Sequence, residues 1–253
     1  MTQITPPKLI TAAILVIGDE ILSGRTKDKN IGYIAEYCTN IGIDVKEVRV
    51  VPDDEAEIVA AINTLRHKFT YLFTTGGIGP THDDITADCV AKAFGVTIDE
   101  DPRALAMMME RYKQEDLNAA RRRMARIPAG ADLILNPVSK APGFKIGNVI
   151  TMAGVPLVMQ AMLDDIGPKL ETGVKMLSQT LEAGGLPEGI YGVALGDIAS
   201  ANGDVSIGSY PSFRDGKFYN QIVIRGRSES AIAAAAKGVQ EMIAKLTADK
   251  NPL

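Results

Sequence analysis

The sequence predicts an α/β fold, in which a mostly parallel sheet lies between two helical layers, followed by a small α+β domain. Three strand-like apolar runs alternate with three segments whose apolar residues recur at helical spacing, as in a sheet covered by helices. After residue 168 the predicted order changes to β-α-β-β-α, which is typical of a small α+β unit. We therefore expect one domain over residues 1–168 and a second over residues 169–253.

The first three strands are predicted from their apolar content. Residues 10–17 form an almost continuous apolar run that stops at Gly18, which is typical of a strand covered on both faces. Residues 44–51 alternate between apolar and polar side chains, and residues 70–75, TYLFTT, form the third run. Each run is short enough to be a strand rather than a helix.

The first three helices follow these strands. Residues 30–41 carry apolar side chains three or four positions apart. Residues 53–69 begin with acidic residues that favour a helix N-terminus. Residues 83–95 end at Gly95, which predicts a left-handed C-terminal cap.

The rest of the first domain is predicted to continue with helix and short strands. Residues 101–126, rich in Met and Arg, are expected to be helical. The strands expected after them are 131–137, 141–147 and 148–154, and a helix is expected over 155–170. In the second domain the expected elements are a strand near 174–182, a helix near 186–201, strands over 204–210 and 217–226, and a last helix over 228–246.

Composition excludes several classes of protein. The 31 acidic residues outnumber the 27 basic ones, so no overall basic excess favours a nucleic acid partner. No apolar run approaches the roughly 18 residues of a membrane span, and the first residues lack the pattern of a signal peptide. The two cysteines, Cys38 and Cys89, lie among apolar residues, so both side chains are expected to be buried in the protein. So few cysteines are typical of a protein from a reducing compartment. We expect a cytoplasmic protein without a membrane partner.

The stretch TTGGIGPTHDDIT, residues 74–86, follows the third predicted strand. Gly76, Gly77 and Gly79 would let backbone amides approach a ligand closely, and the next helix would add its N-terminal dipole. The stretch matches neither the P-loop nor the GxGxxG dinucleotide motif. From the glycines alone, a phosphate site and a tight turn without a ligand both remain open.

Acidic residues in two loops favour a ligand over a simple turn. Asp83 and Asp84 end the glycine stretch, and Asp19 and Glu20 follow the first predicted strand. The carboxyl ends of parallel strands meet at one edge of a sheet, so these loops should face each other there. A divalent metal such as Mg²⁺ would let carboxylates and a phosphate share one pocket. Capping of the helix N-terminus is the simpler role of these acidic residues.

Four motifs resemble the molybdopterin-binding domain family. GDEILSGRTKDKN, TTGGIGPTHDDIT, NPVSKAPGF and AGVP occur in the order found in that family, most closely in the N-terminal part of CinA-like proteins. The resemblance covers about residues 10–168, and IGSYP at 207–211 resembles the smaller second domain of the same proteins. It implies a pocket for a nucleotide or a pterin. In CinA-like proteins this region is associated with metal-dependent hydrolysis of the pyrophosphate in ADP-ribose or related dinucleotides, and a similar domain accompanies the FAD synthase module in eukaryotes.

The resemblance implies a set of site residues. The expected catalytic residues are Asp83, Asp84 and Glu20, and the expected metal ligands are Asp83, Asp84 and Asp19. The expected ligand-binding residues are Gly18, Asp19, Gly24, Asn30, Thr75, Gly76, Gly77, Gly79, Pro80, Thr81, Thr86, Asn136, Pro142, Gly143, Gly154 and Pro156. The chain departs from the family pattern at Lys29, Met124, Ser139, Ala153 and Val158, where Thr, Gln, Gly, Pro and Glu are expected.

Three functions agree with these residues. The preferred hypothesis is a metal-dependent hydrolase of a nucleotide pyrophosphate such as ADP-ribose or FAD. The second is a module of molybdenum-cofactor metabolism that binds molybdopterin without hydrolysing a nucleotide. The third is a regulatory nucleotide sensor whose small C-terminal domain serves as a dimer interface. We expect a nucleotide or pterin as the small-molecule partner, and a homo-oligomer.

Overall fold

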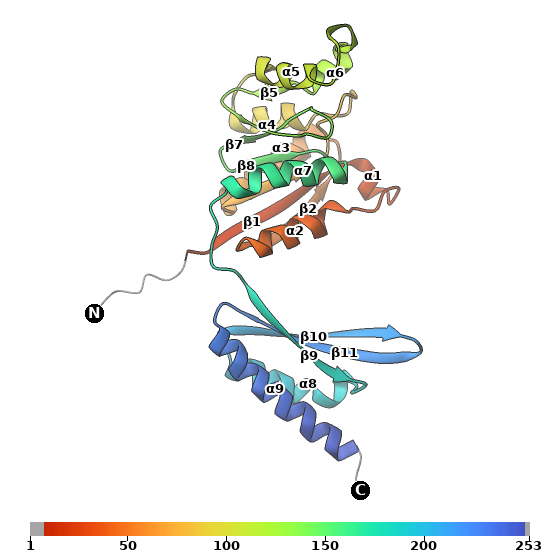
Figure 1. Ribbon diagram of the computed structural model, residues 1–253, viewed down its shortest axis with the longest axis vertical. Coiled ribbons are helices and arrows are strands. Elements are labelled where there is room, and N and C mark those ends of the chain that lie inside the picture. Colours follow the sequence, from red (N-terminus) through yellow and green to blue (C-terminus); the bar gives the residue numbers. More distant parts are fainter. Residues whose placement is uncertain (1–7, 251–253) are drawn as a thin grey trace, which may run out of the picture. The chain divides into compact units, whose positions relative to one another are not determined.

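The computed structural model describes residues 8–250, which form two compact units (Figure 1). The first unit ends at Gly173 and the second begins at Val174. Leu170 is buried in the core of the first unit, and the Gly173 N–H donates to the Gly42 carbonyl at 3.1 Å. These contacts attach the segment after residue 168 to the first unit.

A six-stranded sheet forms the centre of the first unit. Its strand order is β2 (Ile43–Val51), β1 (Ile10–Ile17), β3 (Tyr71–Thr75), β8 (Val149–Met152), β7 (Gly143–Ile146) and β6 (Asp132–Ile134). Strand β1 pairs with β2 and β3, and β3 with β8, all in parallel. Only the pairings of β7 with β8 and β6 are antiparallel. The sheet is therefore mostly parallel, as expected from the sequence.

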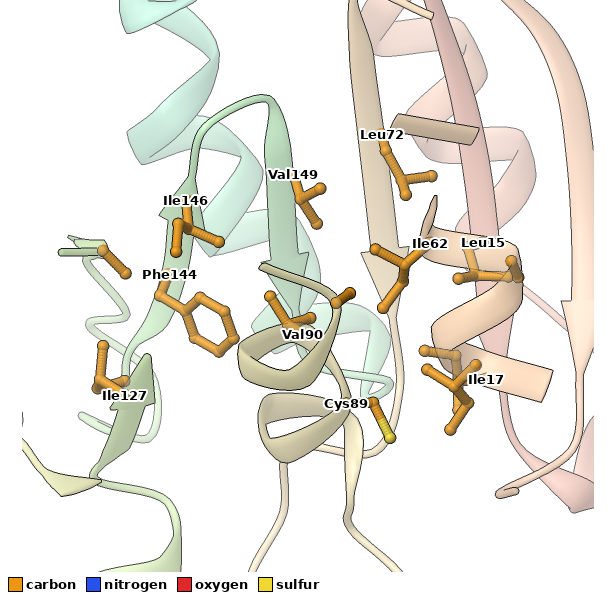
Figure 2. Close-up of a cluster of buried hydrophobic side chains, with 14 of the residues drawn as sticks. Leu15, Ile17, Ile62, Leu72, Cys89, Val90, Ile127, Phe144, Ile146 and Val149 are labelled. Atoms are coloured by element: carbon orange, nitrogen blue, oxygen red, sulfur yellow. The ribbon is translucent and has the colours of Figure 1, made fainter. Parts of the chain in front are cut away.

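Helices cover both faces of this sheet, which confirms the predicted three layers. Successive side chains of a strand point to opposite faces. On β1, Leu15 and Ile17 pack with residues of α3 (Glu55–Lys68) and α4 (Thr86–Phe94), as Figure 2 shows. Ile14 and Val16 pack on the other side with residues of α2 (Asn30–Asn40) and α7 (Pro156–Ile166). Burial on both faces explains the continuous apolar run.

Local capping explains where α3 begins and where α4 ends. The Asp54 carboxylate accepts hydrogen bonds from the N–H groups of Ala56 and Glu57 at the start of α3. Gly95 ends α4 with a φ of 65°, the left-handed conformation expected for a C-terminal glycine. A short helix that was not predicted, α1 (Asp19–Leu22), follows β1.

The prediction of one helical segment over residues 101–126 was wrong. The segment forms α5 (Pro102–Met109), the 3₁₀ helix η1 (Gln114–Asp116) and α6 (Ala119–Arg123). Asn118 caps α6 through a bond from the Arg121 N–H, and an N-cap residue has a non-helical backbone. The end of the segment enters β5 (Arg126–Pro128), which pairs with β4 (Ile98–Glu100). These three-residue strands are too short to show a period.

The second unit has the predicted α+β order. Its antiparallel sheet runs β10 (Val205–Arg214), β11 (Lys217–Gly226) and β9 (Leu177–Gly184), and its helices are α8 (Glu188–Ala201) and α9 (Glu229–Lys250). Its core includes Tyr191, Ile222 and Val239.

The hairpin between β10 and β11 explains two features of the sequence. It turns at Asp215 and Gly216, whose φ angles of 50° and 73° are the positive values that two-residue hairpin turns require. Pro211 lies in the outer strand β10 opposite Asn220. No helix within residues 8–250 is both long enough and apolar enough to cross a membrane.

The buried cysteines lead to a prediction about reactivity. Cys38 and Cys89 are free thiols with no exposed surface, and burial raises the pKa of each to about 12. The thiolate is the reactive form, so neither cysteine should react with a thiol reagent in the native protein at about pH 8. Both should react in concentrated guanidinium chloride, as measured by the release of a coloured thiol. Rapid labelling of the native protein would contradict the packing of α2 and α4.

Candidate functional site

Three loops meet at the carboxyl edge of the sheet, around Gly76. A Cβ atom added to Gly76 would lie 2.1 Å from the Ile17 carbonyl oxygen at the end of β1. A Cβ added to Gly154, after β8, would lie 3.3 Å from the Gly76 Cα. Gly76 also has a φ of 107°, which side chains rarely allow. The backbone at this position can therefore be built only from glycine.

A cavity of about 540 Å³ lies at this edge. Backbone of the glycine loop, at Gly76, Gly77 and Gly79, lines the cavity together with Glu20 and Asp84. The two acidic loops that the sequence placed at one edge therefore line one cavity. Apolar side chains form much of the remaining wall, and they are Ile78, Met124, Val155, Val158 and Met162.

The loop between β6 and β7 also reaches this cavity. Because β7 runs antiparallel to β8, its beginning rather than its end lies at the carboxyl edge. Ser139, Ala141 and Pro142 line the cavity. The Asn136 side chain shapes this loop by donating to the Ser139 hydroxyl at 2.5 Å and to the Ala141 carbonyl at 2.9 Å.

A smaller cavity of about 210 Å³ adjoins the larger one. The two share wall residues, which are Glu20, Thr26, Gly76, Gly154 and Pro156. Lys27, Lys29 and Asn30 line only the smaller cavity, as do Asp28 and Thr75. Sequence reasoning missed Thr26, although it lies within the GDEILSGRTKDKN motif.

The Asp84 carboxylate is held in place by its own loop. Its Oδ2 accepts hydrogen bonds from the Thr81 N–H at 2.8 Å and from the Thr81 hydroxyl at 2.5 Å. The Arg123 guanidinium donates to the Asp84 carbonyl at 3.1 Å, a contact that sequence reasoning did not anticipate. A Cβ on Gly79 would lie 2.6 Å from Asp84 Oδ2, so the carboxylate lies against the glycine loop.

The buried Asn30 side chain joins the loops to each other. Its Nδ2 donates to the Thr75 hydroxyl and to the Gly154 carbonyl, both at 2.8 Å. The Thr75 hydroxyl donates in turn to the Ala153 carbonyl at 2.9 Å. One amide therefore fixes the start of α2 against the ends of β3 and β8.

Nine of the sixteen predicted ligand-binding residues line at least one of the two cavities, and seven do not. The residues outside both cavities are Gly18, Asp19, Gly24, Thr81, Thr86, Asn136 and Gly143, together with the predicted catalytic residue Asp83. Thr81 and Asn136 act on the cavity through Asp84 and the loop before β7, and the Thr86 N–H donates to the Gly77 carbonyl at 2.9 Å. The Asp83 side chain is 62% exposed. Among residues 8–250, no group of three or more His, Cys, Asp or Glu side chains is placed to hold a metal.

The five departures from the family pattern all fall in this site. Lys29 lines the smaller cavity. The larger cavity is lined by the other four, Met124, Ser139, Ala153 and Val158. Two of them place apolar side chains where the pattern has Gln and Glu, which accounts for part of the apolar wall.

A third acidic loop reaches the same edge at Asp53, after β2. Its carboxylate accepts a hydrogen bond from the Asp19 N–H at 3.0 Å. Burial raises the pKa of Asp53, and the nearby carboxylates of Asp19, Glu20 and Asp83 raise it further against the effect of that bond. The sequence analysis did not include Asp53. Its position just after the parallel strand β2 could have placed it at the same edge of the sheet.

Comparison with known proteins agrees with this architecture. Residues 13–172 match the family described as probable molybdopterin binding domain, and residues 175–251 match the FAD synthase middle domain. A protein from Archaeoglobus fulgidus is 30% identical over 91% of this chain and 96% of its own length. A probable FAD synthase from Caenorhabditis elegans is 30% identical over 94% of this chain. The match covers 51% of the length of that relative.

A solved structure extends the comparison to the fold. The crystal structure of the protein CinA from Thermoplasma acidophilum aligns with a TM-score of 0.60 and 37% identity. The alignment covers 64% of this chain and 98% of that protein. The chain therefore belongs to the molybdopterin-binding domain family and is CinA-like.

Proposed function

We propose that the first unit hydrolyses the pyrophosphate bond of a nucleotide such as ADP-ribose or FAD, with a divalent metal such as Mg²⁺. The observation that carries this proposal is that Glu20 and Asp84 line the same cavity as the glycine loop. The volume of that cavity, about 540 Å³, lies within the usual range of small-molecule sites. The apolar wall would cover the flat ring of a base. The match of the second unit to the FAD synthase middle domain supports a dinucleotide as the substrate.

The carboxylates that line the cavity fit a metal that binds together with the substrate. Mg²⁺ is commonly bound by one or two protein carboxylates plus substrate phosphates. Asp84 would supply such a carboxylate, and Glu20 would stay free to act as a base. The metal would neutralise the charge that develops on the phosphates and activate a water molecule. Asp19 and Asp83 lie outside the cavity and would act only through their charge.

The backbone of the glycine loop would bind a phosphate. The Gly76 N–H donates to the Met152 carbonyl at 3.2 Å. Within residues 8–250, the N–H groups of Gly77, Ile78 and Gly79 have no such partner and remain for an anion. Glu20 would accept the proton of the attacking water, whose oxygen bonds to one phosphorus while the bridging P–O bond breaks. From ADP-ribose the products would be AMP and ribose 5-phosphate.

A binding role without hydrolysis is the second candidate function. The match to the probable molybdopterin binding domain favours it. In that case the glycine loop would bind the phosphate of molybdopterin, and the apolar wall would cover the pterin ring. Tight binding of molybdopterin, together with no turnover of ADP-ribose or FAD, would support this function over the first.

Adjacent aspartates provide a matched test of the hydrolase. Asp84→Asn should lower the release of AMP from ADP-ribose in Mg²⁺ by roughly 100-fold, because it removes a charge that lines the cavity. The Asn side chain can still accept from Thr81, so the loop should keep its shape. Asp83→Asn removes the same charge outside the cavity and should have a much smaller effect. Chromatographic separation of AMP from ADP-ribose measures both rates.

Three outcomes would decide against the proposal. One is the absence of AMP from ADP-ribose and from FAD with each of several divalent metals. Another is equal loss of activity in Asp83→Asn and Asp84→Asn, which would mean that charge alone and not position matters. The third is unchanged activity in Asp84→Asn.

The raised pKa of Asp53 predicts a pH-dependent effect on stability. A carboxyl whose pKa is raised on folding destabilises the folded protein above that pKa, where it is ionised, and not below its unfolded value. Asp53→Asn should therefore raise Tm near neutral pH and lose that advantage at about pH 3. The Asn oxygen can still accept from the Asp19 N–H. Thermal unfolding followed by circular dichroism across this pH range tests the prediction, and a lower Tm at neutral pH would refute it.

A further inference from the structure

We propose that Arg123 is a positioning residue of the phosphate site, whose positive charge lies beside the glycine loop and offsets the negative charge of Asp84. The proposal rests on the proposed function in one respect, because it takes the backbone N–H groups of residues 77–79 as the place where a phosphate binds. It adds a cation that acts on the site without facing the ligand, since Arg123 lines neither of the two cavities.

Arg123 differs from the three arginines around it in the charge that it faces. Those neighbours are Arg121, Arg122 and Arg126, and each lies within 4.0 Å of an Asp or Glu carboxylate. Arg126, for example, donates to both oxygens of the Asp88 carboxylate, at 2.6 and 2.8 Å. Arg123 forms no ion pair within residues 8–250. Its positive charge is therefore the one in this group that no carboxylate neutralises.

The Arg123 guanidinium binds the backbone of the acidic loop instead. It donates to the Asp84 carbonyl at 3.1 Å, which attaches the end of α6 to the segment that precedes α4. The side chain is partly buried, and its Nε has no hydrogen-bond partner within residues 8–250. A cation that is withdrawn from water without a counter-charge is costly. An anion bound on the nearby loop would lower that cost.

The loop separates Arg123 from the larger cavity. Gly79 and Asp84 line that cavity, and they also line a space of about 10 Å³ beside Arg123. That space is about as large as a single water molecule requires, so it is too small for a phosphate. The guanidinium would therefore attract a phosphate in the larger cavity through the loop and not by contact. Salt screens charges weakly over less than about 10 Å, so this attraction persists at ordinary ionic strength.

A fixed cation explains how an anion can bind beside an acidic side chain. The Asp84 carboxylate alone would repel a phosphate that the loop N–H groups attract. With Arg123 next to the same loop, the two charges cancel before any metal arrives. The glycine loop should therefore bind a phosphate even in the absence of a metal.

Binding of inorganic pyrophosphate to the full chain in metal-free buffer tests this role without any turnover. In isothermal titration calorimetry, Arg123→Gln should bind pyrophosphate about tenfold more weakly than the wild type, because it removes the charge but keeps an amide donor for the Asp84 carbonyl. Arg123→Lys keeps the charge and should recover most of the affinity. Added salt should weaken binding by the wild type more steeply than binding by Arg123→Gln, which a purely structural loss would not produce.

The adjacent arginine provides a matched control. Arg122 is already paired with Glu100, to which its Nε donates at 2.9 Å, so Arg122→Gln should bind pyrophosphate like the wild type. Equal affinity of Arg123→Gln and the wild type, or an equal loss in both Gln variants, would overturn the role of Arg123 even if the protein hydrolyses ADP-ribose. No binding of pyrophosphate by the wild type would also overturn it. A tenfold loss that Lys restores, without any release of AMP, would support Arg123 while the proposed hydrolysis fails.

Discussion

The site depends on the close approach of three backbone segments at Gly76. With a side chain at this position, the end of β3 could not lie against the Ile17 carbonyl and beside Gly154. Separation of these strand ends would draw Asn30 away from Thr75 and Gly154 and would part Glu20 from the glycine loop. The parallel pairing of β1, β3 and β8 brings the loops to one edge, and the missing Cβ allows them to touch.

Hydrogen bonds within the protein hold the polar groups of the site before any ligand arrives. Thr81 fixes Asp84, and Asn30 fixes the loops that follow β3 and β8. Such preorganisation matters because a site loses affinity when its groups must be ordered on binding. Asp53, Asp19 and Glu20 add like charges at the same edge, and burial, together with these charges, raises the pKa of Asp53. A cation at this edge would relieve the repulsion among them.

Much of the fold could be predicted from the sequence, and less of the site. Buried strands such as β1 and capped helices such as α3 have local signals, and the edge shared by Glu20 and Asp84 follows from parallel topology. The break at Asn118 and the short pair β4 and β5 depend on tertiary contacts that have no period. Motifs could not separate Asp84 from Asp83, because which of two adjacent side chains turns toward the cavity depends on the path of the loop. They gave no sign that Asn30 would keep an unpaired oxygen.

The proline in β10 has a consequence for the second unit that is unrelated to catalysis. Strand β10 is one of the two edge strands of its sheet and is ten residues long, and an exposed edge of that length can pair with a strand of another polypeptide. Pro211 has no amide hydrogen, so a strand that paired with β10 would lack one backbone hydrogen bond in the middle of the contact. Pairing along this edge is therefore disfavoured, which would matter most when the protein is concentrated.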